Sequence, residues 1–298
     1  MLDATIKGSY ADPMNKLDAK ARAQILHLLC EGSSIRAVTR LTGASKNTVT
    51  KLVVDAGRAC LDYQDTKFRN LTCKRIQVDE IWSFVYAKAL NAPIEKKIAG
   101  QAGDVWTWTA IDADTKLIPS WYIGDRSSQS AWEFLTDLRK RLNNRIQLTS
   151  DGHKAYLVGV AGSFGDDVDY AQLVKIYGKE PHSGGQRRYS PAECLGAIKT
   201  PVSGEPNPEH ISTSFAERAN LTMRMNMRRF TRLTNAFSKK IENHAHAVAL
   251  HMMYYNFVRI HKTLRVTPAM AAGVTDKLWE ISDVVEMLEA WEATQLRT

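Results

Sequence analysis

The stretch Ile76-Gln77-Val78-Asp79-Glu80-Ile81-Trp82 sets two neighbouring carboxylates inside an apolar run that predicts a β-strand. Buried charges of this kind cost free energy unless they are paired or bind a metal ion. Because side chains alternate along a strand, Glu80 shares a face with Val78, whereas Asp79 shares the more polar face of Gln77. The polar face suits a metal site better, so we choose Asp79 as a ligand and keep Glu80 as its competitor.

The elements predicted around this strand follow one another in an informative order. Further strands are expected at 104–112, 117–123, 146–149 and 168–176. A helix capped by Ser127 or Ser128 follows the third strand, and helical patterning returns from Ser212. Three strands, a helix, two strands and then helices are the order of a ribonuclease-H-like α/β domain, which we expect over residues 74–275.

The segments outside these elements complete the expected organisation. Residues 178–210 contain Gly, Pro, Ser and Arg throughout and are predicted to form a long loop within the domain. Residues 1–15 are expected to be a flexible lead-in, and residues 276–298 a C-terminal helical tail. An all-α unit is predicted between the lead-in and the α/β domain.

That all-α unit spans residues 16–62 and shows three short helical patterns. Asp18 and Ser45 are suited to cap the first and third helices, and Gly43 lies in the turn before the third. This layout is typical of a DNA-binding helix-turn-helix, although a plain three-helix packing unit would look similar. The outward residues of the third helix, which can bind phosphates or base edges, are Lys46, Asn47, Thr50 and Lys51.

Two more carboxylates are candidates to join Asp79. Asp151 ends the fourth strand, at the edge where open α/β sheets bind ligands, and Glu217 lies in the first turns of a later helix. Each has an ordinary alternative, since Asp151 precedes Gly152 as turn residues often do, and Glu217 would favour a helix N-terminus. If the three converge, they can act as catalytic metal ligands and hold two Mg²⁺ or Mn²⁺ ions for phosphodiester cleavage.

Basic residues are concentrated directly after Glu217. No acidic residue interrupts the interval from 218 to 240, so the run forms either a solvated face or a surface that binds DNA phosphates. We expect the second, because the run adjoins a candidate metal ligand. Its members are Arg218, Arg224, Arg228, Arg229, Arg232, Lys239 and Lys240.

Several segments together resemble the Asp-Asp-Glu (DDE) transposases of bacterial insertion sequences, most closely the insertion-sequence-one family. They are DEIWSFVYAK (79–88), SDGHKAY (150–156), ERANLTMR (217–224), AFSKK (236–240) and YNFVRIHKTL (255–264), followed by Thr267-Pro268. The resemblance covers roughly residues 74–275. It implies metal-ligand positions for Asp79, Asp151 and Glu217, and a DNA contact near the cut for Arg224. It also implies dimers or larger synaptic assemblies on DNA.

The chain departs from this pattern in two places. Some relatives carry an N-terminal zinc finger, whose cysteines are absent here, and the predicted loop at 178–210 has no counterpart. The four cysteines, Cys30, Cys60, Cys73 and Cys194, are scattered and are expected to be buried packing residues rather than zinc ligands or disulfides.

The composition of the 298-residue chain agrees with a DNA-associated protein. With 40 Lys and Arg against 32 Asp and Glu, its net charge of +8 favours polyanionic partners. No uncharged apolar run approaches the ~20 residues of a membrane helix, and no signal peptide is visible. We therefore expect a cytoplasmic, nucleoid-associated protein that binds double-stranded DNA, both transposon ends and target, and no membrane.

Three hypotheses for function remain open at this point. The first is a transposase that binds transposon ends and catalyses strand cleavage and strand transfer. The second is a catalytically silent or domesticated transposase that acts only as a sequence-specific DNA-binding protein. The third is a nuclease with the same metal site and no strand transfer.

Overall fold

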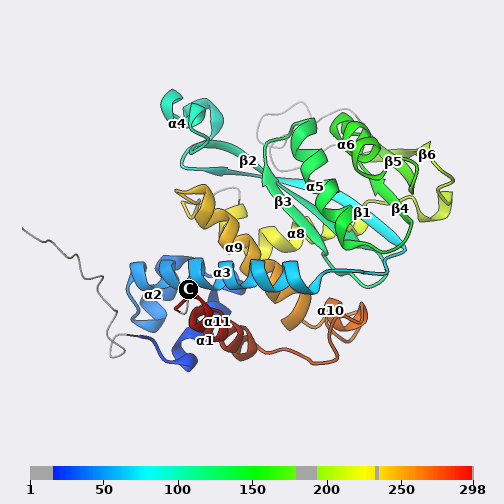
Figure 1. The fold of residues 1–298 in the computed structure, drawn as a ribbon. Coiled ribbons are helices and arrows are strands. Elements are labelled where there is room, and N and C mark those ends of the chain that lie inside the picture. Colours follow the sequence, from blue (N-terminus) through cyan, green and yellow to red (C-terminus); the bar gives the residue numbers. More distant parts are fainter. Residues whose placement is uncertain (1–15, 179–192, 232–234, 297–298) are drawn as a thin grey trace, which may run out of the picture.

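The computed structural model describes residues 16–178, 193–231 and 235–296 of the chain (Figure 1). It shows an α/β protein built on one mixed sheet of six strands. The expected lead-in at 1–15 lies outside the described residues. None of the described helices combines the length and the apolar character needed to cross a membrane.

The sheet has the strand order β3-β2-β1-β4-β5-β6. The strands are β1 (Arg75–Val85), β2 (Gly103–Asp112), β3 (Ser120–Gly124), β4 (Ile146–Ser150), β5 (Val168–Tyr177) and β6 (Cys194–Ser203). The pairs β1/β4 and β4/β5 are parallel, and the other three neighbouring pairs are antiparallel. This arrangement is compatible with the expected ribonuclease-H-like domain, and the five predicted strands are confirmed to within a few residues.

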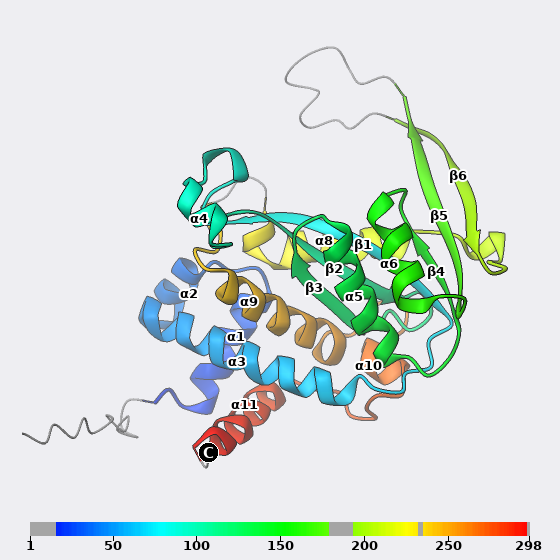
Figure 2. The same cartoon turned by 45° about the horizontal axis from the view of Figure 1, so that its top comes forward.

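The central position of β1 explains its composition. Ile76, Val78 and Ile81 are all at most 1% exposed, because helices cover both faces of the sheet. The helices α5 (Ser128–Arg141) and α6 (Lys154–Phe164) lie on one face, and α8 (Ser214–Asn226) and α9 (Ile241–Met253) lie on the other (Figures 1 and 2).

The helix α6 is an element that the sequence reading missed. Gly159 and Gly162 lower the helical propensity of this segment. Both glycines are where α6 approaches α5: a Cβ at Gly159 would lie 2.9 Å from Leu135 Cδ1, and one at Gly162 would lie 2.9 Å from Trp132 Cδ1. The residues that weaken the local pattern are therefore those that the packing requires.

The predicted loop at 178–210 was wrong in part, since residues 194–203 form β6 against β5. Nine of the ten side chains of β6 are exposed, so burial imposes no apolar alternation on the strand. Backbone pairing with β5 holds it at the edge of the sheet. Residues 179–192 of the predicted loop lie outside the described part of the chain.

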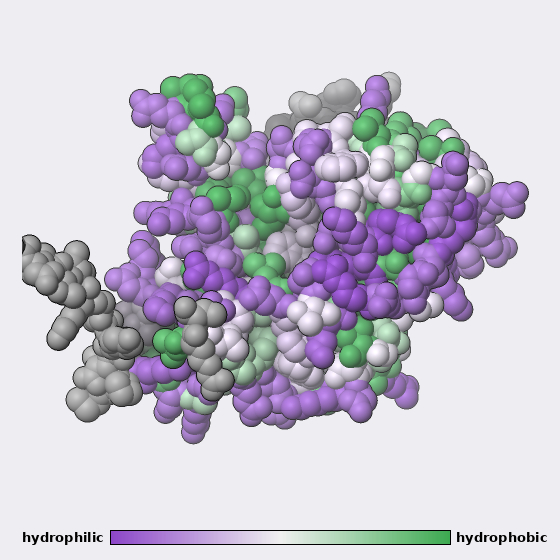
Figure 3. Space-filling model, viewed as in Figure 1, coloured by the Kyte–Doolittle hydropathy of each residue, from purple (hydrophilic) through white to green (hydrophobic). Residues whose placement is uncertain are grey.

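The segment between β1 and β2 contains a short helix, α4 (Ile94–Ile98). It forms the tip of an arm that stands away from the sheet (Figure 1). Leu90, Ile94 and Ile98 are each more than 60% exposed, and apolar side chains gather at this tip in the space-filling view (Figure 3).

The N-terminal helices form as predicted, with the expected caps. They are α1 (Ala19–Cys30), α2 (Ile35–Thr42) and α3 (Lys46–Lys67). The side chains of Asp18 and Ser45 accept hydrogen bonds from Ala21 N and Thr48 N at 2.7 and 3.1 Å, and Gly43 ends α2 with a φ of 73°. The α3 helix is longer than expected and passes the predicted boundary at residue 62.

The predicted N-terminal unit and the predicted C-terminal tail pack together. The C-terminal helices after α9 are α10 (Pro268–Ala271) and α11 (Ile281–Gln295). Arg22 of α1 donates to Glu292 of α11 at 3.0 Å, while α3 runs beside α9 so closely that a Cβ at Gly57 would lie 2.4 Å from His246 Cβ. The three N-terminal helices therefore share a core with the rest of the protein.

The cysteines are all free thiols, as expected. Cys30, Cys60 and Cys73 are buried and act as packing residues. Cys194 contradicts the expectation, because it lies on the exposed edge strand β6.

Candidate metal centre

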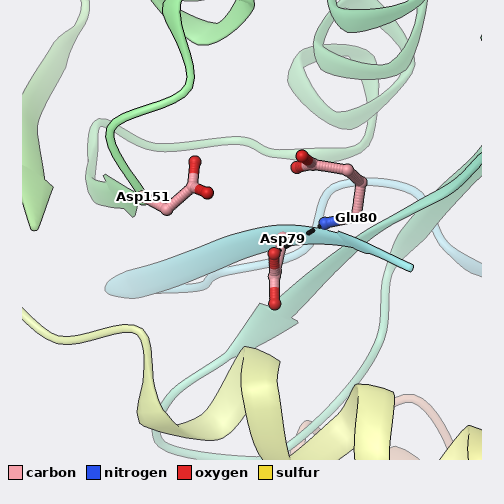
Figure 4. Close-up of side chains that lie close together, drawn as sticks. All are labelled: Asp79, Glu80 and Asp151. Atoms are coloured by element: carbon pink, nitrogen blue, oxygen red, sulfur yellow. Dashed lines mark hydrogen bonds between the residues drawn. The ribbon is translucent and has the colours of Figure 1, made fainter. Parts of the chain in front are cut away.

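Three carboxylates meet where β1 passes the end of β4. Asp79, Glu80 and Asp151 each offer a ligand oxygen, and these atoms lie within 4.8 Å of one another (Figure 4). Asp79 and Glu80 come from the middle of β1, and Asp151 follows the last residue of β4. Among the described residues, this is the one group of three or more ligating side chains so placed.

The parallel pairing of β1 and β4 brings these residues together. Gln77 is the partner of Thr149, so Asp79 and Asp151 each follow a paired position by two residues. Gly152 lets the chain turn beside β5, since a Cβ there would lie 2.8 Å from Val174 Cγ2. The glycine that suggested an ordinary turn thus also allows the close packing that positions Asp151.

Among the residues that the structure describes, Asp79 has no basic partner at hydrogen-bonding distance. Its two oxygens accept hydrogen bonds from the Glu80 backbone N–H and from Asn220 Nδ2, both at 2.8 Å. Burial, and next the charge of Glu80, raise the pKa of Asp79 to about 7 despite these hydrogen bonds. A divalent cation would offset the repulsion from Glu80, which is the second cause of this rise after burial.

Glu80 projects to the opposite side of β1 from Asp79, as strand alternation predicts (Figure 4). Tyr156 donates to its Oε2 at 2.8 Å, and Arg126 donates to its Oε1 at 2.8 Å. Burial and then the charge of Asp151 raise the pKa of Glu80, although these two hydrogen bonds oppose the rise. Because the Arg126 guanidinium already compensates the charge of Glu80, Glu80 is the less available ligand of the pair.

Asp151 is half-buried at the start of the loop that leads into α6. Its Oδ1 accepts a hydrogen bond from the backbone N–H of His153 at 2.9 Å. The His153 ring stacks on Trp108, with 6.0 Å between the ring centroids. This stacking packs the loop against β2 and thereby fixes the direction of the Asp151 carboxylate.

Glu217 is not a member of the carboxylate group. Both of its oxygens accept hydrogen bonds from Lys175 Nζ of β5, at 2.5 and 2.6 Å, and Thr213 Oγ1 also donates to it at 2.7 Å. Asn220, one turn further along α8, reaches Asp79. Glu217 therefore lies on the side of α8 that faces the metal centre, with its charge neutralised by Lys175.

The predicted DNA-binding residues of the C-terminal half differ in exposure. Arg218, Arg228, Lys239 and Lys240 are exposed, and Arg224 is half-buried. Arg229 departs from the expectation, because its guanidinium donates to Ser238 Oγ beside the buried His244. Burial lowers the pKa of Arg229 to about 10. Arg232 lies outside the described residues.

The four predicted DNA-binding residues of α3 lie together on its first turns. Lys46, Asn47 and Lys51 are exposed, and Lys51 pairs with Asp55 at 2.5 Å. Thr50 is half-buried and donates to the backbone oxygen of Lys46 at 2.8 Å. Opposite them Val49, Leu52 and Val53 are buried.

Four side chains of the site have roles that the sequence reading did not assign. Tyr156 and Asn220 both belong to the segments that carry the resemblance. Tyr156 lies five residues after Asp151, and Asn220 lies three residues after Glu217. Arg126 and Lys175 carry no such signal. Their partners lie 46 and 42 residues away in the sequence, and only the folded chain brings them together.

The chain was compared with protein-family models and with curated proteins. No family model matches the chain, and no curated protein matches it.

Proposed function

We propose that the protein is a DDE transposase that cleaves and joins DNA strands at a metal centre held by Asp79 and Asp151. The observation that carries the proposal is the meeting of carboxylates from β1 and β4 in a largely buried setting. Oxygen ligands of this kind suit Mg²⁺ or Mn²⁺. The strand order, which fits a ribonuclease-H-like domain, supports the same proposal.

Two divalent cations would activate the attacking oxygen and stabilise the leaving oxygen of the phosphodiester. Asp79 and Asp151 would hold these ions, and Glu217 would join them if Lys175 gave up its carboxylate. Asn220 orients Asp79, whereas Arg126 and Tyr156 hold Glu80. These hydrogen bonds hold the carboxylates close together, with Asp79 on one side of β1 and Glu80 on the other (Figure 4).

The DNA partner is proposed from the positions of the basic residues. Exposed Lys46 and Asn47 on α3 are suited to double-stranded DNA at the transposon ends. Arg218 and Arg224 follow Glu217 on α8 and are suited to the strand near the cut. A dimer or larger assembly would be needed to bring two ends together, and the bacterial nucleoid would be the place of action.

The test is a plasmid assay with the full chain, Mg²⁺ and supercoiled DNA carrying the sequences that flank the gene. We expect Asp79→Ala and Asp151→Ala each to lower strand cleavage by at least about 1000-fold, since metal stabilisation of charge is worth several kcal/mol. DNA binding should change less than about twofold.

Asp276→Ala removes an exposed carboxylate far from the cluster and is the matched control. Glu80→Gln tests whether Glu80, rather than its neighbour Asp79, is the metal ligand on β1. We expect this variant to keep at least about a tenth of the activity. Cleavage by Asp79→Ala near the wild-type rate would contradict the assignment. Nicking without joining by the wild-type protein would favour the nuclease hypothesis.

One observation favours a second candidate function, a catalytically silent DNA-binding protein. The Lys175 ammonium occupies both oxygens of Glu217, the third expected ligand. If this ion pair persists with Mg²⁺ present, the chain would bind DNA without cutting it. The plasmid assay distinguishes this outcome because it scores binding, nicking and joining separately.

A further inference from the structure

A small basic cavity lies on the side of α8 away from Glu217. It encloses about 120 Å³ between α8, the end of β2 and the segment that follows α9. Phe215, Arg218, Ala219 and Thr222 line it from α8, at helical spacings of three and four that place them on one face. This volume holds several water molecules, and hence also a tetrahedral oxyanion.

The lining is strongly cationic. Lys116, Arg218, Arg259 and Lys262 all contribute to it, and no carboxylate does. The last three are exposed, and none of their side chains forms an ion pair within the described residues. Burial lowers the pKa of His261, another lining residue, and the neighbouring cations, Lys116 first among them, lower it further. Asp112 and Asp114 act on the charge of Lys116, so the cations that no carboxylate of the described residues pairs with are Arg218, Arg259 and Lys262.

The walls of the cavity are held in place by local structure. Lys116, with a φ of 61°, has its ammonium 3.3 Å from the centroid of the Phe215 ring. A π-helical turn at Tyr254–Val258 precedes Arg259, and the backbone N–H groups of Leu264 and Arg265 close a tight turn on His261 O. Turns of the π type are frequent at functional sites. The cations thus project from ordered backbone rather than from a free tail.

The cavity and Asp79 lie on two different flanks of α8. The Gln77 side chain of β1 accepts hydrogen bonds from Phe215 N and Ala216 N, at 2.7 and 3.3 Å, so α8 begins above β1. Glu217 faces β5 through Lys175, whereas the cavity reaches Ile111 of β2 on the other side. An α-helix with its side chains is ~10–12 Å across, so the cavity and the metal centre are separated by a distance of this order.

We propose that this cavity is a second phosphate-binding site, which holds a backbone phosphate of the nucleic-acid strand whose cleavage is assigned to the carboxylates. The proposal rests on the proposed function for the identity of the strand. Unpaired guanidinium and ammonium groups around an enclosed volume favour phosphate oxygens. A strand that crosses α8 would pass from this anchor to the metal centre within a few nucleotides.

The test measures binding by the full chain in EDTA, where neither metal binding nor cleavage takes place. The probe is a fluorescein-labelled 20-base-pair duplex, titrated between 50 and 200 mM salt. We expect Arg259→Gln/Lys262→Gln to weaken binding at least 10-fold and to lower the slope of log affinity against log salt by about one, as the loss of one phosphate contact should. Lys20→Gln/Lys140→Gln removes the same charge at exposed, unpaired positions and should change affinity less than about twofold.

The remaining arms separate the possible results. An equal loss in both double variants would overturn the proposal, because it would show a diffuse charge effect. Tight binding of inorganic pyrophosphate that depends on Arg259 but does not compete with duplex would also overturn it, in favour of a free phosphorylated ligand. The same 10-fold loss in an Asp151→Ala background would support it even if the proposed cleavage were absent.

Discussion

The two flanks of α8 carry opposite charges and differ in their exposure to water. On one flank Asp79 faces α8 through Asn220 and lies close to Glu80 and Asp151, and burial, and next the charge of Glu80, raise the pKa of Asp79 to about 7. On the other flank Arg259 and Lys262 are exposed to water and need no partner for stability. Acids are expensive to bury without a cation, whereas exposed cations cost little. The acidic flank therefore needs a bound cation to compensate its charge, whereas the basic flank needs no partner.

The ion pair of Lys175 and Glu217 determines whether Glu217 belongs to the acidic flank of α8. If Glu217 is a metal ligand, Glu217→Gln should lower Mg²⁺-dependent cleavage at least about 100-fold, because a lost ligand removes several kcal/mol of charge stabilisation. Lys175→Met should keep cleavage and increase the apparent affinity for Mg²⁺, because it frees the carboxylate.

The two variants are matched, since each removes one half of the same pair. The measurement is the cleavage rate as a function of Mg²⁺ concentration. Equal losses in both variants would show that the pair is structural, and that the site consists of the carboxylates from β1 and β4 alone.

A smaller effect is expected on α3, where the recognition of DNA base sequence can be separated from the binding of phosphates. Asn47 is exposed on the first turn of α3, remote in sequence from both flanks of α8. Asn47→Ala should cost ~1–3 kcal/mol for one base position, and leave the salt dependence of binding unchanged. Lys46→Ala, its neighbour, should instead weaken binding to all sequences alike.

The measurement is competition binding of the full chain with a duplex that the wild-type protein selects from a randomised pool. Mutated versions of that duplex report the preference at each position. If the wild-type protein selects no sequence, end recognition does not lie in α3, and the helix serves only the packing seen against α9.

Much of this architecture could be predicted, because the residues that decide it act locally. Ser45, Gly43 and the apolar spacing of Val49 and Leu52 define the ends and the buried face of α3 without tertiary information. The strand β1 likewise shows its buried character in its own composition. Asp151 was predicted from its place at the end of a strand, where open α/β sheets bind ligands, and Asp79 from the polar face of its strand.

The misses come from contacts between segments far apart in the sequence. The helix α6 contains two glycines that only its packing on α5 explains, and β6 is defined by pairing with β5 rather than by burial. Arg229 turns inward to Ser238 although the preceding Arg228 is exposed. Periodicity describes one segment at a time, so it carries no information on such partners.

Asp79 is proposed to bind a divalent cation. Asp79→Asn should therefore stabilise the protein without metal and reduce the stabilisation that metal gives. With its folded pKa near 7 and an unfolded pKa near 3.8, Asp79 keeps a proton that the unfolded chain releases. Its contribution to stability is therefore present below pH 3.8 and is lost as the pH rises through 7. Removal of the charge should stabilise the metal-free protein most at pH 8, by about 1–3 kcal/mol, since a lost hydrogen bond and partial hydration reduce the full effect.

The measurement is the free energy of unfolding in urea at pH 8, for wild type and Asp79→Asn, in EDTA and in millimolar Mn²⁺. We expect Asp79→Asn to be the more stable protein in EDTA, and the wild type to gain at least about 2 kcal/mol more than the variant from Mn²⁺. Asp276→Asn, at an exposed position, should behave as wild type in both conditions. Equal stabilisation of all three proteins by Mn²⁺, or none, would contradict a metal centre at Asp79.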